Sequence, residues 1–221
     1  MILTAQQPHY LPDFRQLCKL SAGEVYLFAD HLQFRKQSAV SRARLPGEKT
    51  TVLSVPIRKS APLTISHLKI DGQSNWMRKH LRFMELQFKY FPYFDHYFPA
   101  LKELYRQNCA AAADFWWALL QWHCKVLGLG KTVLRSREEG IAGRDDLVRW
   151  ALKKGITGMA VWEEELPYYR QHFWEFELWT LPEPATPKDF PRTYDPHMAF
   201  LPLLFYYGPQ AGEFLRGKSP N

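Results

Sequence analysis

The first thirty residues alternate apolar and polar segments in a way that predicts a parallel β-α-β unit. Residues 1–5 are apolar, a Pro-bounded loop follows at residues 6–12, and Asp13 is placed to cap a short helix. A second apolar run at residues 24–29 ends at Asp30. Two strands joined by one crossover helix pair in parallel, so the loop and Asp30 are both expected at carboxyl ends of strands.

The middle of the chain changes from short apolar runs to helical periodicity. Pro and Gly interrupt the runs between residues 31 and 70, which is typical of a meander or hairpin that decorates the main sheet. Three helices then form a predicted insertion at about residues 74–128: residues 74–90, a helix from Tyr97 or Pro99 to about residue 109, and residues 115–127 behind a cap at Asp114.

The last third of the chain repeats the strand-helix-strand pattern. A strand at residues 131–135 precedes a helix that opens at residue 143 with acids in its first turn and closes before Gly155. Six prolines between residues 182 and 202 exclude regular structure there. The remaining predicted elements are strands at residues 158–162 and 173–179 and a short final helix near residues 203–207 or 210–215.

These patterns predict an α/β fold with a mainly parallel central sheet, built from two β-α-β units with a helical insertion, in a single domain over residues 1–221. Hydrophobic residues make up 46% of the chain and charged residues 23%, which is typical of a folded protein. Three cysteines (Cys18, Cys109 and Cys124) cannot form a closed disulfide framework. With no signal-peptide pattern and no apolar run near 18 residues, we expect a cytoplasmic protein without a membrane span.

The net charge of the chain limits the classes of partner that it is expected to bind. Lys and Arg number 29 against 22 Asp and Glu, which gives a net charge of +7 and suits nucleic acid, a nucleotide-linked substrate or an acidic carrier protein. We take the positive charges to be spread along the chain, with the aromatic residues in apolar segments, so nucleic acid is the least favoured. Gly-rich phosphate loops, zinc-type Cys pairs, HExxH and GxSxG are absent, and neither a metal nor a cofactor is expected.

The loop after the first strand is the most informative segment for function, because ligands bind at such strand ends in open α/β sheets. Its candidates for substrate binding are Gln6, Gln7, His9 and Tyr10, and the alternative is a rigid turn whose polar groups satisfy the local backbone. Asp30 is a candidate base or ligand for a hydroxyl or amine, with capping of the next turn as the alternative.

Two further segments carry candidate chemistry. Residues 35–44 hold four bases and no acid, which suits a clamp for phosphate or pantetheine-type groups, whereas a solvated hairpin tip is the plain alternative. On the helix at residues 74–90, Trp76 and His80 share one stripe and Lys79 lies beside them. His80 is then either a core histidine or a general base in a partly desolvated cleft.

The ordered motifs QQPHYLP, FADHLQFRKQS, SRARL, TVLSVPI, WMRKHL, YFPYFDHYFP and LLFYYGP resemble the WbqC-like family over most of the chain. The resemblance implies transfer of an acyl or aminoacyl group onto an amino sugar or similar amine, in O-antigen, surface-glycan or natural-product biosynthesis. It marks these residues: Gln7, Pro8, Tyr10, Leu11, Pro12, Asp30, Gln33, Phe34, Arg42, Trp76, Lys79, His80, Tyr90 and the turn at Pro92, Tyr93 and Phe94.

The chain also departs from the family pattern. Gln6 stands where the family has histidine, Ser41 where it has asparagine, and Ala199 and Pro202 where it has serine and aspartate. These departures indicate either an altered substrate or a binding protein that has lost activity.

We therefore expect an acyl or aminoacyl transferase with His80 and Asp30 as catalytic residues and an amine or sugar acceptor. The donor would be linked to an acidic acyl carrier protein or a sugar nucleotide. A nucleotidyltransferase-like enzyme and a non-catalytic binding module remain as alternatives. If one substrate is shared, the residues Gln7, Tyr10, Asp30, Arg42, Lys79 and His80 should converge on one cleft.

Overall fold

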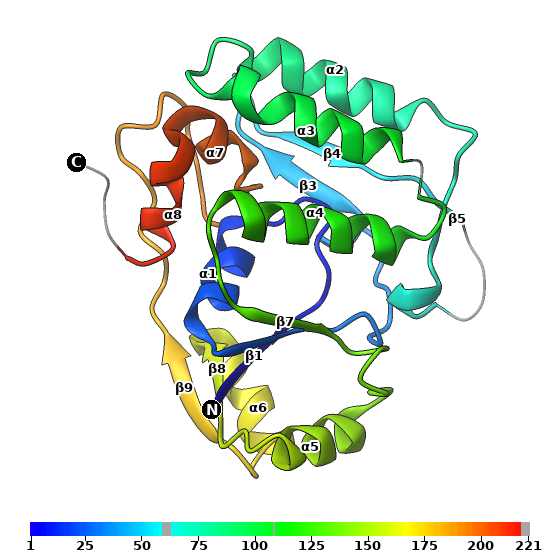
Figure 1. Cartoon of the computed structure of the whole chain (residues 1–221), viewed down its shortest axis with the longest axis vertical. Coiled ribbons are helices and arrows are strands. Elements are labelled where there is room, and N and C mark those ends of the chain that lie inside the picture. The colour runs from blue at the N-terminus through cyan, green and yellow to red at the C-terminus, as the bar shows by residue number, and fades with distance from the viewer. Residues whose placement is uncertain (59–62, 108, 218–221) are drawn as a thin grey trace.

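The computed structural model describes residues 1–58, 63–107 and 109–217 and is built on a five-stranded sheet in which all strands are parallel (Figure 1). The predicted α/β class with a parallel central sheet is confirmed. The strand order is β7-β2-β1-β8-β9, with bounds β1 (Ile2–Gln6), β2 (Val25–Phe28), β7 (Thr132–Arg135), β8 (Gly158–Trp162) and β9 (Glu177–Leu181).

Helices cover both faces of this sheet because its strands carry apolar side chains on both sides. Tyr26 and Phe28 of β2 point into one core with α1 (Phe14–Ala22) and α4 (Ala112–Val126). Val25 and Leu27, the alternate residues, point into a second core with α5 (Arg144–Lys153) and α6 (Leu166–His172). In Figure 1, α4 accordingly lies above the sheet and α5 below it.

The strand order places a topological switch point beside β1. The chain goes from β1 through α1 to its neighbour β2, but from β7 it crosses through α5 to β8, which pairs with the opposite edge of β1. The second predicted strand-helix-strand segment thus joins strands that are not neighbours, because strand and helix order alone does not say how many strands a crossover passes. Ligands of open α/β sheets bind outside the carboxyl ends of strands at such a point.

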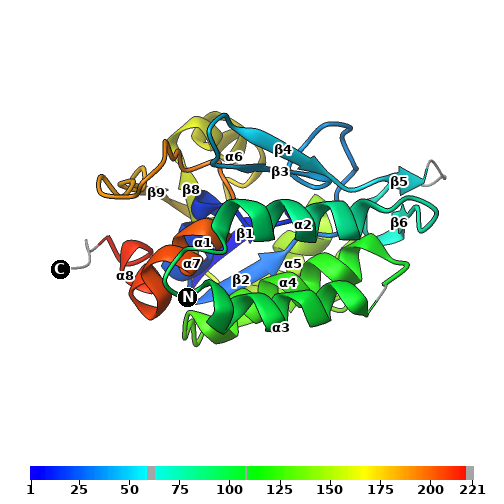
Figure 2. The ribbon, with the colours of Figure 1, turned by 90° about the horizontal axis from the view of Figure 1, so that it is seen from above.

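The segment predicted to decorate the sheet forms two small antiparallel sheets of its own. β3 (Arg42–Leu45) pairs with β4 (Thr51–Ser54), and β5 (Ile57–Arg58) pairs with β6 (Lys69–Ile70), with a 3₁₀ turn, η1 (Ile65–His67), between β5 and β6. The β3–β4 hairpin lies alongside α2 (Trp76–Phe88) in Figure 2. The next helix, α3 (Phe94–Arg106), continues the predicted helical insertion.

Several predicted bounds are wrong, each for a local reason. α3 begins at Phe94, before the predicted start, and accommodates Pro99 inside the helix. Asp114 does not cap α4, which begins at Ala112; its carboxylate accepts hydrogen bonds from two arginines instead. The strand predicted at residues 173–179 begins only at Glu177, because residues 173–176 form the turn that follows α6. Before α6 lies a 3₁₀ turn, η2 (Glu163–Glu165).

The Pro-rich segment has no helix or extended strand between residues 182 and 200, as expected. It still contacts the core: Ala199 forms an isolated bridge with Asp13, and Met198 forms one with Arg44. The chain then ends with α7 (Leu201–Tyr207), a 3₁₀ turn, η3 (Gly208–Gln210), and α8 (Ala211–Phe214), so both predicted positions for a final helix are helical. None of the helices in the described ranges is long and apolar enough to cross a membrane.

Candidate functional site

Two cavities meet at the carboxyl end of β1. One, of about 510 Å³, lies on the α6 side of the sheet and is here called the α6 cavity. The other, of about 410 Å³, lies against the β3–β4 hairpin and is called the hairpin cavity. Gln6 and Gln7 line both cavities. The predicted loop therefore does lie at a hollow surface, at the switch point of the sheet.

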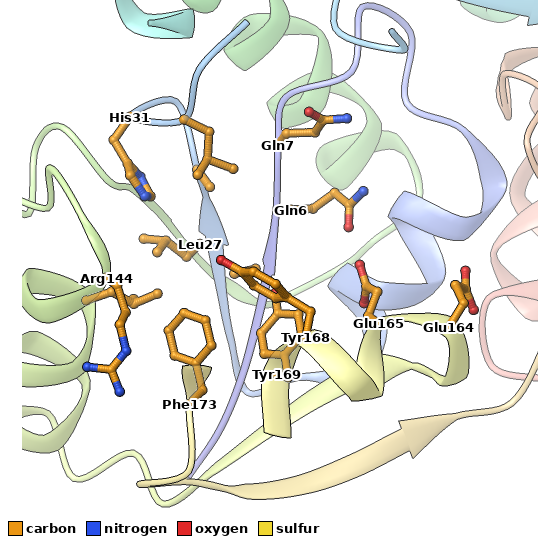
Figure 3. Close-up of a pocket in the computed structure, with 14 residues that line it drawn as sticks. Gln6, Gln7, Leu27, His31, Arg144, Glu164, Glu165, Tyr168, Tyr169 and Phe173 are labelled. Atoms are coloured by element: carbon orange, nitrogen blue, oxygen red, sulfur yellow. The ribbon is translucent and has the colours of Figure 1, made fainter. Parts of the chain in front are cut away.

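The α6 cavity has an apolar floor and a polar rim (Figure 3). Leu27, Leu147 and Phe173 belong to the core beneath it. On the rim, Tyr168 of α6 is 57% exposed. The other polar residues of the rim are Gln6, Gln7, His31, Arg144, Glu164 and Glu165.

The carboxylates of this rim are held by cations of α1. Glu165 accepts a hydrogen bond from the fully buried Lys19, 2.6 Å away, and another from the backbone N–H of Trp162. Glu164 pairs with Arg15. Each carboxylate oxygen has several acceptor positions, so both groups keep capacity for a further donor from a ligand.

The hairpin cavity has a histidine and an aspartate in its wall. His9 Nδ1 lies 3.0 Å from Asp13 Oδ2, at ion-pair distance although the N–H bond does not point straight at the oxygen. The other ring nitrogen, Nε2, is 3.4 Å from Gln6 Nε2. With the proton on Nδ1, the ring has its N–H near the Asp13 carboxylate and its Nε2 lone pair toward the Gln6 amide. An imidazole oriented by a carboxylate is the arrangement of a general base.

Hydrogen bonds fix the loop that carries these groups. Asp13 Oδ1 accepts from the backbone N–H of Gln16 and caps α1 as predicted. Gln16 Nε2 donates to the carbonyl of Gln7 at 3.3 Å, and the backbone N–H of Tyr10 donates to the carbonyl of Ala39 at 2.9 Å. The loop is thus tied to α1 on one side and to the segment before β3 on the other.

His80 and Tyr10 do meet, but in the hydrophobic core. The Tyr10 hydroxyl is 2.7 Å from His80 Nδ1 and also bonds the Tyr105 hydroxyl, and the ring of Trp76 packs edge-on against both Tyr10 and His80. Burial lowers the pKa of His80 to about 4, against a smaller opposing effect of the Ser54 backbone. His80 is 5% exposed and lines neither the α6 cavity nor the hairpin cavity.

Asp30 lies at the end of β2 as expected and is completely buried. Its carboxylate accepts hydrogen bonds from Arg135 at 3.0 Å, from the Ser136 hydroxyl at 2.8 Å and from the backbone N–H of Arg137 at 3.2 Å. These bonds join the ends of the neighbouring strands β2 and β7. The carboxylate faces protein groups rather than either cavity.

The six residues expected in one cleft do not line a single cavity. Gln7 and Arg42 line the hairpin cavity, Tyr10 and His80 are a core pair, and Asp30 is engaged elsewhere. Lys79 is exposed on the outer surface of α2, because it follows a different stripe from His80. Among the other candidates, Trp76 is buried, Tyr90 is 86% exposed, and Gln33 is exposed and forms an isolated bridge with Thr64.

Sequence reasoning missed several residues of the two cavities. Asp13 was assigned only a cap; its contact with His9 forms in the loop before α1, where helical spacing is no guide. Glu164 and Tyr168 were missed because η2 and α6 were not predicted. His31, directly after Asp30 at the end of β2, was missed as well. The hairpin cavity also contains Arg44 and His197, which come together only through the fold of the C-terminal segment.

The excess positive charge is not spread along the chain, contrary to expectation. Residues 31–106 contain 14 Lys and Arg against 5 Asp and Glu, whereas the rest of the chain contains 15 and 17. The positive part therefore comprises the two small sheets and helices α2 and α3. In the described part of the chain, no group of three or more His, Cys, Asp or Glu is arranged to hold a metal ion.

Comparison with known proteins identifies one family. The model of the WbqC-like protein family matches residues 7–213, which is nearly the whole chain, so the protein belongs to this family. Neither the curated proteins nor the solved structures contain a match.

Proposed function

From this family membership and from the geometry around β1, we propose that the protein transfers an acyl or aminoacyl group to the amine of a small molecule such as an amino sugar. The observation that carries the proposal is the position of His9, beside Asp13, in the wall of a cavity at the switch point. An amine must lose a proton when it is acylated, and His9 is the ionisable group best placed to accept it.

The proposed step uses His9 as the general base. The amine displaces the Gln6 amide from His9 Nε2, its nitrogen attacks the acyl carbonyl carbon of the donor, a C–N bond forms, and His9 Nε2 takes the proton from nitrogen. The bond from the carbonyl carbon to the leaving sulfur or oxygen breaks, and its electron pair goes to the leaving group. Asp13 stabilises the imidazolium that results, because its carboxylate lies 3.0 Å from Nδ1.

Gln6 takes part as a hydrogen-bond donor. Its amide nitrogen is 3.4 Å from His9 Nε2, and once the amine takes its place there, the amide is free to donate to the carbonyl oxygen as that oxygen gains negative charge. Gln6 stands where the family pattern has histidine, and His9 supplies an imidazole next to that position. The departure at Gln6 is in this proposal a rearrangement of the site rather than a loss.

The two cavities take different substrates. The hairpin cavity contains Arg42, Arg44 and His197, which suits an acidic donor. The α6 cavity offers the exposed ring of Tyr168 and carboxylates, which suit a ring-shaped acceptor that carries hydroxyl or amine hydrogens. Asp30 and His80, predicted to be catalytic, act in this proposal by holding the framework behind the loop and do not contact substrate.

The experiment is an assay of the purified chain with acyl donors linked to carrier protein, to sugar nucleotide or to coenzyme A, together with a set of amino sugars, and detection of the amide by mass spectrometry. Loss of a general base lowers the rate by about 10²–10⁴. We expect His9→Gln to show that loss and Asp13→Asn a smaller one. Amide formation that His9→Gln leaves unchanged would contradict the proposed base.

A non-catalytic binding module is the second candidate, and one observation favours it. Ala199 and Pro202, which replace polar residues of the family pattern, are both buried in apolar surroundings. The same assay addresses it: calorimetric binding of donor and amine without any product would support the binding module. A separate reaction with ATP that releases pyrophosphate would support the nucleotidyltransferase-like alternative.

A further inference from the structure

A third cavity, of about 330 Å³, adjoins the hairpin cavity and is lined by bases without an acid. We call it the Arg42 cavity, because Arg42 and Gln37 belong to the walls of both hollows. Its other charged residues are Lys36 and Arg58. No Asp or Glu lines it, and within the described residues neither Lys36 nor Arg42 forms an ion pair.

The backbone around this cavity is held in place. Gln37 has a φ of 64°, a left-handed conformation that side-chain-bearing residues rarely adopt. The turn is secured by the Ser38 hydroxyl, which donates to the carbonyl of Arg35, and by the backbone N–H of Arg42, which donates to the carbonyl of Ser38. A defined turn thus presents Lys36 and Arg42 toward the same hollow.

The rest of the lining is suited to an organic group beside an anion. Phe34 and Ile57 are partly buried against the main core, and Leu63 is 52% exposed at the cavity. Ser41 and Ser54 supply hydroxyl groups. A cation cluster next to an apolar wall binds a phosphate ester better than a free inorganic ion, because both parts of the ester find a partner.

We propose that the Arg42 cavity binds a phosphate group of the acyl donor, with Arg42 at the passage through which the donor extends into the hairpin cavity toward His9. This assignment rests on the proposed function, since it is the donor of that reaction that carries the phosphate. Arg58 pairs with Asp71, so Lys36 and Arg42 are the two cations of the cavity that are left for a ligand. Two cations match a phosphodiester, with one negative charge, or a phosphate monoester, with between one and two near neutral pH. The phosphate belongs to a phosphopantetheine arm or to a nucleotide.

The test uses matched pairs of probes and calorimetry on the full chain without turnover. 4′-Phosphopantetheine is compared with pantetheine, and ADP with adenosine; the pair that shows the larger difference identifies the source of the phosphate. We expect the phosphorylated probe to bind at least tenfold more tightly than its partner, and salt to weaken this binding. Equal binding within both pairs would overturn the proposal.

Variants locate the site. Arg42→Ala and Lys36→Ala should each weaken the phosphorylated probe about tenfold or more, and Arg42→Lys should weaken it less. Arg82→Ala, on the exposed surface of α2, is the control and should change nothing. Binding that Arg42→Ala and Lys36→Ala leave unchanged would show a non-specific anion effect and would also overturn the proposal.

The two proposals fail separately. If the phosphorylated probes bind through Arg42 but no amine is acylated, the phosphate site stands and the transferase function fails. The phosphate site fails, and the transferase function stands, under two conditions together. The enzyme must accept a donor without phosphate at the same rate as its phosphorylated form, and Arg42→Ala must leave the His9-dependent rate unchanged.

Discussion

His9 and His80 belong to two neighbouring regions, because Tyr10 follows His9 in the chain and bonds His80. The two regions differ in their surroundings. The first region, the cavity wall, comprises Gln6, His9 and Asp13; the second, the buried support, comprises Tyr10, Asp30 and His80. His9 and His80 are almost equally buried, at 6% and 5% exposed. His9, however, has a carboxylate, an amide and a cavity beside it, whereas His80 has Tyr10 and Trp76. The fraction of surface buried therefore does not separate a histidine placed for chemistry from one that supports the fold; its partners do.

The largest effect on stability is expected in the buried support, at Asp30. Asp30→Ala removes the carboxylate from a buried network and leaves Arg135 without its closest buried partner. Breaking a buried ion pair in this way costs about 3–5 kcal/mol. Chemical denaturation measures the free energy of unfolding, with Asp145→Ala, whose side chain is 84% exposed, as a control expected within about 0.5 kcal/mol of wild type. A loss below about 1 kcal/mol for Asp30→Ala would remove Asp30 from the support.

The next effect concerns pH. Burial lowers the pKa of His80 and of His123 to about 4, below the value near 6.5 of an unfolded chain. Between these values the unfolded state binds more protons, so the stabilisation is complete above about pH 6.5 and is lost as the pH falls toward 4, by up to about 3 kcal/mol for each group.

The variant His80→Gln separates this contribution from those of other groups. The free energy of unfolding, measured from pH 7 to pH 4, should fall less steeply for His80→Gln than for wild type. The His123 contribution remains in both proteins and serves as the internal reference. Identical slopes would show that His80 titrates normally and is not part of the buried support.

A smaller effect is expected at the Tyr10 hydroxyl, which joins His80 to Tyr105. Tyr10→Phe leaves two buried polar groups without this partner and should destabilise the protein by about 1–3 kcal/mol. Tyr90→Phe, at an 86% exposed position, is the control and should have no effect. Thermal unfolding measures both. If Tyr10→Phe were as stable as wild type, the hydroxyl groups of Tyr10 and Tyr105 and the imidazole of His80 would not form a connected network.

The smallest change in stability is expected at the rim of the α6 cavity. Tyr168→Ala removes an exposed ring, so the free energy of unfolding should stay within about 0.5 kcal/mol of wild type. If the ring contacts the acceptor, KM for the amine should rise about tenfold while kcat changes little. The control is Trp174→Ala, 75% exposed and not among the residues that line this cavity. An equal KM for both variants would place the acceptor elsewhere.

The main sheet could be predicted because its strands are apolar runs bounded by Gly, Pro and acids. β8 was predicted with its observed bounds, and α1 with its cap at Asp13. The position of β7 could not be predicted, because strand order depends on contacts between distant segments such as Leu27 with Leu134. α6 was missed because it is short and none of its residues is fully buried, so it has no clear apolar stripe.

The position of the candidate site in the fold could be predicted, but the side chains that line it could not. The loop at residues 6–12 was assigned to a strand end, which the parallel β-α-β pattern determines. Which side chains line a cavity depends on packing: His80 and Lys79 are neighbours in sequence, yet one enters the core and the other faces solvent. The pairing of His9 with Asp13 is local but depends on the conformation of the loop before α1, and His197 reaches the cavity only through the Pro-rich segment.

The most direct test of the central claim is the rate of amine acylation per folded molecule, measured for His9→Ala and His80→Ala in the same assay, with the folded fraction set by circular dichroism. If the cavity wall does the chemistry and the buried support holds it, His9→Ala should lose at least about 100-fold in rate per folded molecule, while His80→Ala should be destabilised but keep its rate per folded molecule within about fivefold. A large loss of rate in folded His80→Ala, with His9→Ala unaffected, would contradict the account and return the role of base to His80.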